Sequence, residues 1–73
     1  MRDAAERHRQ AARTHDMAAI RHDAAATYWT DRGNAGRADI ETRSAALQRA
    51  GAQLERERAR LDEADEDGLE RGA

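Results

Sequence analysis

Apolar residues recur every seven positions in both halves of this 73-residue chain. In the first half, each pair of alanines is followed by His, or by Trp in the last repeat: Ala4-Ala5-x-x-His8, Ala11-Ala12-x-x-His15, Ala18-Ala19-x-x-His22 and Ala25-Ala26-x-x-Trp29. The second half carries a large apolar series and a small one: Ile40, Leu47, Leu54 and Leu61, and Ala38, Ala45, Ala52 and Ala59. A seven-residue period keeps residues on one face of a helix. The pattern therefore predicts helices over about 2–32 and about 37–62.

Between the two periodic segments lies the one stretch where glycine and asparagine cluster, and it predicts a turn over 33–36. Gly33 suits the left-handed position that ends a helix, and Asn34 suits the N-cap of the next helix. A continuous helix through Gly33 and Gly36 would cost about 1 kcal/mol per glycine relative to alanine. We therefore expect an all-α antiparallel helical hairpin, with one long coiled-coil helix or a disordered chain as the alternatives.

The spacing of the two large stripes predicts how the helices pair. Trp29 and Ile40 lie equally far from the point between Asn34 and Ala35, and so do the pairs His22 and Leu47, His15 and Leu54, and His8 and Leu61. Because residues equidistant from a hairpin turn lie opposite each other, we expect the leucine series to pack against the His/Trp series within the hairpin.

Helix 1 has a second apolar side, which suggests that the hairpin self-associates. At 100° per residue, Met17, Ile20, Ala24 and Tyr28 form a patch opposite the Ala/His/Trp face. One partner helix cannot cover both sides, so we expect two hairpins to dimerise into a four-helix bundle. The expected interface consists of Met17, Ile20, Ala24, Tyr28, Trp29, Ile40, Leu47, Leu54 and Leu61.

Composition and charge divide the chain into a hairpin over 1–61 and an acidic tail over 62–73. The first segment carries twelve Arg against nine acidic residues, and the tail carries six acidic residues against one Arg. Carboxylates oppose the helix dipole at a C-terminus, so we expect the tail to be flexible. A domain of this size without cysteine also has little core of its own, which favours oligomerisation.

The histidines are the only candidate chemical groups in a repeated arrangement. His8, His15 and His22 lie about 10 Å apart along a helix, too far to share a metal ion. We expect them to fill the helix seam, with an interchain metal site or a pH-sensitive interface as alternatives. No catalytic residue, cofactor or enzyme activity is expected. Alternating Arg and acidic residues argue against nucleic-acid binding, and the charged N-terminus argues against a membrane segment or signal peptide, so a cytoplasmic location is expected.

Two resemblances accompany this interpretation. The segment Ala24-x3-Tyr28-x4-Gly33-Asn34-x3-Ala38 resembles the helix-turn-helix of a single tetratricopeptide repeat. The whole chain resembles short uncharacterised Ala/Arg/His heptad hairpin proteins of GC-rich bacteria, a resemblance that implies a hairpin and no activity. The sequence therefore predicts a non-enzymatic, self-associating interaction module. The alternatives are a small regulator that folds on or binds another protein, and a His-dependent metal or pH sensor.

Overall fold

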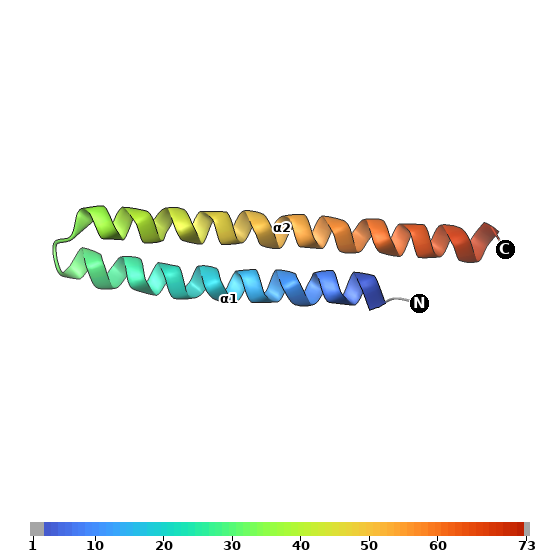
Figure 1. Ribbon diagram of the computed structural model, residues 1–73, viewed down its shortest axis with the longest axis horizontal. Coiled ribbons are helices and arrows are strands. Elements are labelled where there is room, and N and C mark those ends of the chain that lie inside the picture. The colour runs from blue at the N-terminus through green and yellow to red at the C-terminus, as the bar shows by residue number, and fades with distance from the viewer. Residues whose placement is uncertain (1–2, 73) are drawn as a thin grey trace.

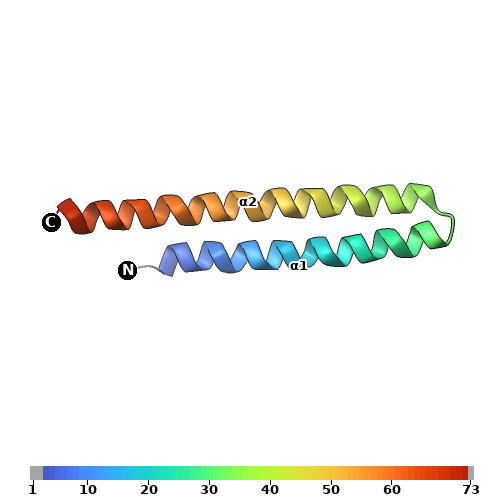
Figure 2. The ribbon, with the colours of Figure 1, turned by 180° about the vertical axis from the view of Figure 1, so that it is seen from behind.

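Two long α-helices pack side by side in opposite directions. The computed structural model describes residues 3–72, and it describes side chains up to Gly68. Helix α1 spans Asp3–Asp31 and helix α2 spans Ala35–Gly72, joined by a tight turn (Figures 1 and 2). The resulting rod measures 62 × 13 × 9 Å. The predicted all-α hairpin is confirmed, with no strand between residues 3 and 72.

Glycine and asparagine form the turn as the sequence predicts. Gly33 adopts a left-handed φ of 74°. Its amide donates a hydrogen bond to the Thr30 carbonyl at 3.0 Å, and the Asn34 amide donates to the Trp29 carbonyl at 2.9 Å. These two bonds satisfy the last carbonyls of α1 in a Schellman motif. The Asn34 side chain then accepts a hydrogen bond from the Arg37 amide at 3.1 Å and caps α2.

The turn is shorter than predicted, because α2 begins at Ala35 rather than near residue 37. Gly36 is helical, and between residues 3 and 72 only residues 32–34 lie outside the helices. Once Asn34 caps the helix, Ala35 and Gly36 occupy its first turn. Glycine costs least there, since the amides of a first helical turn have no intrahelical partner.

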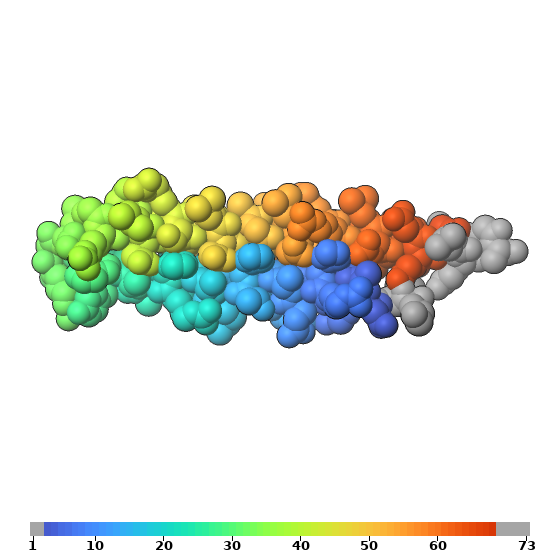
Figure 3. Space-filling view, viewed as in Figure 1, coloured from blue at the N-terminus to red at the C-terminus, as the bar shows by residue number. Residues whose placement is uncertain are grey.

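The contact between the helices is built from alanine. Seven alanines are 9% exposed or less: Ala5, Ala12 and Ala19 of α1, and Ala38, Ala45, Ala52 and Ala59 of α2. Among the described side chains no larger hydrophobic residue is buried. In the space-filling view the two helices touch along the whole length of α1 (Figure 3). The core of this hairpin is therefore a single row of methyl groups from each helix.

The leucine series does not lie in this seam, so the predicted packing of leucine against histidine is wrong. The exposed fractions are 55% for Ile40, 74% for Leu47, 53% for Leu54 and 65% for Leu61. Each of these residues follows a buried alanine by two positions, which is about 200° around a helix. When the alanines face α1, the leucines must face outward.

The predicted end of the second helix is also wrong. We expected the helix to end near residue 62 and a flexible tail to follow, whereas α2 continues to Gly72. Glu63 pairs with Arg9, and Asp62 lies 3.3 Å from the His8 ring. These contacts oppose the unfavourable interaction of acidic residues with the helix dipole, which is worth only about 0.3–1 kcal/mol. Met1, Arg2 and Ala73 lie outside the described residues. No helix between residues 3 and 72 is both long and apolar enough to cross a membrane.

Candidate functional site

The three histidines reach across the seam to polar residues of α2. Each ring donates or accepts one hydrogen bond of 2.6 Å at Nδ1: His8 with Glu55 Oε2, His15 with Gln48 Oε1, and His22 with Glu41 Oε2. Every one of these α2 residues follows a buried alanine by three positions, just as each histidine does in α1. The sequence analysis missed Glu41, Gln48 and Glu55. The signal that could have found them is this Ala-x-x-polar repeat in the second half of the chain.

His8 lies between two carboxylates of α2. Its Nδ1 contacts Glu55, and its Nε2 lies 3.3 Å from Asp62 Oδ2. The hydrogen bond from His8 is the main cause that lowers the pKa of Glu55, and Arg58 adds to this effect. Of these two contacts only the one with Glu55 is a hydrogen bond, since Asp62 Oδ2 has no hydrogen-bond partner. The Glu55 bond orients the ring across the seam, which favours a structural role.

A metal site is not apparent at the histidines. Within the described part of the chain, no group of three or more His, Cys, Asp or Glu side chains is placed to hold a metal ion. The structure instead places His15 next to Gly51, where an added Cβ would lie 3.3 Å from the ring. The seam between His15 and α2 is therefore too close-packed for a side chain at position 51 without movement of the ring.

The opposite edge of the seam is closed by ion pairs. Among the described side chains, three arginine–carboxylate pairs join α1 to α2 there: Arg9 with Glu63, Asp16 with Arg56, and Asp23 with Arg49. Their side chains are between 34% and 53% exposed, and such pairs contribute about 0.2–1 kcal/mol each. These pairs help to set which residues of the two helices lie opposite each other, but they add little to the stability of the hairpin.

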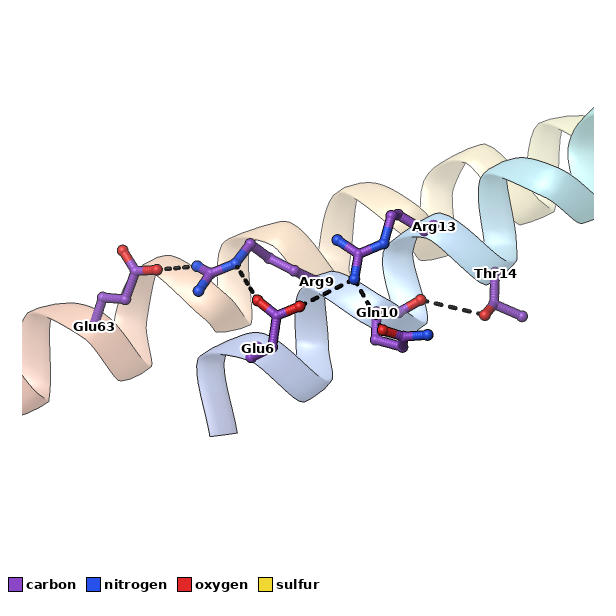
Figure 4. Close-up of polar contacts among 6 residues, drawn as sticks. All are labelled: Glu6, Arg9, Gln10, Arg13, Thr14 and Glu63. Carbon is purple, nitrogen blue, oxygen red and sulfur yellow. Dashed lines mark hydrogen bonds and ion pairs between the residues drawn. The ribbon is translucent and has the colours of Figure 1, made fainter. Parts of the chain in front are cut away.

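A small pocket of about 270 Å³ opens near these ion pairs and is lined by Arg9, Arg13, Arg56, Ala59 and Arg60. Arg9 and Arg13 both hydrogen-bond Glu6, at 3.2 Å and 3.0 Å, and Arg9 also reaches Glu63 (Figure 4). These two arginines lower the pKa of Glu6, Arg13 more strongly. Because carboxylates already hold Arg9, Arg13 and Arg56, the pocket does not point to an anion site.

Large apolar side chains gather instead on two outer surfaces. The first is the leucine stripe, which we define as Ile40, Leu47, Leu54 and Leu61 and which runs about 30 Å along α2. The second is the α1 patch, which we define as Met17, Ile20, Ala24 and Tyr28. Met17, Ile20 and Tyr28 are 55%, 59% and 47% exposed, and Ala24 is exposed as well.

Next to the turn, the aromatic residues are covered by arginines. The rings of Tyr28 and Trp29 meet edge to face with centroids 5.0 Å apart. Arg32 lies 3.4 Å above the Tyr28 ring, and Arg37 lies 4.7 Å above the Trp29 ring. Trp29 is half-buried and closes the seam at its turn end. Part of the α1 patch is thus shielded, whereas all four residues of the leucine stripe are more than half exposed.

Comparison with protein-family models, curated proteins and solved structures finds no match for this chain. The described residues define a helical hairpin with an alanine seam and two outer apolar surfaces. Its function is therefore inferred from those surfaces.

Proposed function

We propose that this protein is a non-enzymatic helical interaction module that associates with itself, two hairpins forming a four-helix bundle. One observation carries the proposal: among the side chains that the structure describes, the hairpin buries only alanine in its seam and leaves all four large residues of the leucine stripe more than half exposed. Exposed apolar surface of this extent marks an interaction site in a folded protein.

The size of the leucine stripe is consistent with dimerisation. Burying a Leu or Ile side chain fully contributes about 1.5–3 kcal/mol. The four side chains of the stripe are between 53% and 74% exposed, so complete cover would contribute roughly 4–8 kcal/mol per chain. Because both chains of a dimer contribute this free energy, the total gain is comparable to the free-energy cost of association, which is about 4–15 kcal/mol. A dimer of modest affinity follows.

The weakness of the seam supports the same proposal. A buried methyl group contributes only about 0.8 kcal/mol, and small domains with such cores need additional support. A second hairpin would supply it by covering the leucine stripe.

The arrangement of the histidines favours a structural role over catalysis or metal sensing. His8, His15 and His22 each use Nδ1 to hydrogen-bond α2. Such a bond orients functional histidines as well, so the structural role rests on a second observation: among the described residues, no group of three or more His, Cys, Asp or Glu side chains could hold a metal ion. The cytoplasmic location remains a prediction.

The α1 patch favours a second candidate function, binding of a different protein. Met17 and Ile20 lie on the back of α1, away from the seam, and are more than half exposed. In this case the chain would act as a small regulator that stays monomeric without its partner, and its helices would be poorly formed when alone.

Light scattering and circular dichroism on the purified chain over a dilution series separate the two functions. Self-association predicts a strongly helical species with twice the 8.1 kDa chain mass, whose helicity falls as dilution separates the chains. A monomer at all concentrations, with helicity independent of dilution, would contradict the proposal. A poorly helical monomer would support the regulator instead.

A further inference from the structure

We propose that the second copy docks on the leucine stripe with its α2 antiparallel to the first α2, about a two-fold axis that passes between Ala50 and Gly51. This inference rests on the proposed self-association and adds to it the surface, the direction and the register. It also reduces the expected interface to the four residues of the leucine stripe and leaves out the α1 patch. Because the stripe lies about 200° around α2 from the seam, the four helices then form a single layer rather than the closed four-helix bundle.

The stripe is symmetric about two small residues. Its midpoint falls between Ala50 and Gly51, so an antiparallel copy places Leu47 opposite Leu54 of the second copy, and Ile40 opposite its Leu61. Side chains at a two-fold axis meet their own copies. Ala50 is exposed and is the small residue there that lets the two helix backbones approach, so that the leucines on either side can interdigitate; Gly51 faces His15 in the seam.

Charges beside the stripe are complementary in this arrangement. Arg43 and Glu57 each follow a residue of the stripe by three positions, and they lie equally far from Ala50 in opposite directions. About the axis between Ala50 and Gly51, Arg43 of one copy lies one position, about 1.5 Å along the helix, from the level of Glu57 of the other and on the same border of the stripe, twice in the dimer. Both side chains are exposed, Arg43 to 69%, and Arg43 also pairs with the exposed Asp39 of its own helix at 3.0 Å. On the other border of the stripe, Arg37 and Asp65 lie equally far from Gly51 and make a second complementary pair.

The opposite direction of packing is electrostatically worse. A parallel copy would place the acidic ends of both α2 helices side by side, and the segment 62–67 holds five carboxylates and no basic residue. It would also align the two helix dipoles. An antiparallel copy separates the acidic segments to opposite ends of the stripe.

The α1 patch is a poorer surface for a second copy. From Met17 to Tyr28 it covers about 16 Å of helix, about half the length of the leucine stripe. Arg32 also covers the ring of Tyr28. We therefore assign the α1 patch no role in the dimer.

Charge reversal tests the register of the dimer. Arg43→Glu or Glu57→Arg replaces two attractive contacts by two repulsive ones, so each single variant should raise the dimer dissociation constant about tenfold. The double variant R43E/E57R should restore it. Arg21→Glu, an exposed charge reversal on α1, is the matched control and should leave the constant unchanged. Single variants that dissociate no more readily than the control would overturn the register.

Cysteine cross-linking tests the position of the axis, since the natural chain contains no cysteine. Ala50→Cys should form covalent dimers rapidly with a short cross-linker that reacts with a thiol at each end, because the two copies of residue 50 meet near the axis. Ala24→Cys, in the α1 patch, should not. Cross-linking at residue 24 but not at residue 50 would refute the α2 interface while leaving self-association intact. If the natural chain is a monomer, both the α2 interface and the proposed self-association are refuted.

Discussion

Enlarging one alanine in the seam should destabilise the hairpin. Ala45 is 0% exposed, so its methyl group is fully enclosed where α2 packs against α1. Ala45→Leu adds three carbon atoms at this contact. The helices would have to separate, and separation would stretch the hydrogen bonds from His15 to Gln48 and from His22 to Glu41.

The expected cost of Ala45→Leu is about 1–3 kcal/mol, the usual penalty for overpacking a closely packed core. For a chain of this length the total free energy of unfolding is roughly 4–11 kcal/mol. The melting temperature should fall by about 4–8 °C for each kcal/mol lost.

Thermal unfolding followed by circular dichroism, at a fixed chain concentration, measures this effect. Ala46→Leu is the matched control, because Ala46 is the next residue and is exposed. Its melting temperature should change little. If Ala45→Leu melts at or above the temperature of the natural chain, the seam is not formed by closely packed alanines and the reasoning is refuted.

Three further predictions concern the turn and the pH dependence. Gly33→Ala should cost about 1–2 kcal/mol because Gly33 has a left-handed φ of 74°, whereas Gly68→Ala, where an added Cβ meets nothing within 4 Å, should not lower stability in the same melting assay. Asn34→Ala should cost about 0.5–2 kcal/mol in urea unfolding through loss of the N-cap; an unchanged midpoint would mean that the cap contributes nothing. His8 lowers the pKa of Glu55 from its ordinary value of 4.5, so the stability from Glu55 is present above about pH 4.5 and is lost as pH falls through its folded-state pKa. The stability of the Glu55→Gln variant should therefore fall less steeply than that of the natural chain as the pH is lowered through this range. Identical acid transitions of the two chains would exclude this contribution from Glu55.

The turn and the antiparallel hairpin could be predicted because local chemistry determines them. A left-handed backbone position strongly favours glycine, and an N-cap favours asparagine. Gly33 and Asn34 stand next to each other between two periodic segments, so one interpretation satisfies both preferences.

The inward face of α2 could not be predicted from periodicity alone. The alanine series and the leucine series both repeat every seven residues, and both have a counterpart in α1 at about the same distance from the turn. Choosing the larger side chains as the core is the usual rule, and here it fails. Complementary chemistry decides the question: Glu41, Gln48 and Glu55 stand opposite three histidines only when the alanines face inward.

The most direct test of the proposed self-association compares the mass of two variants by sedimentation equilibrium. Leu47→Asp places a charge in the middle of the leucine stripe, and Ile20→Asp places the same charge in the α1 patch. An aspartate buried in an apolar interface is strongly disfavoured, whereas one on an exposed surface is nearly neutral. Dimerisation through α2 predicts that Leu47→Asp sediments at the 8.1 kDa chain mass while Ile20→Asp retains twice that mass. A Leu47→Asp variant that remains as dimeric as the natural chain would contradict it.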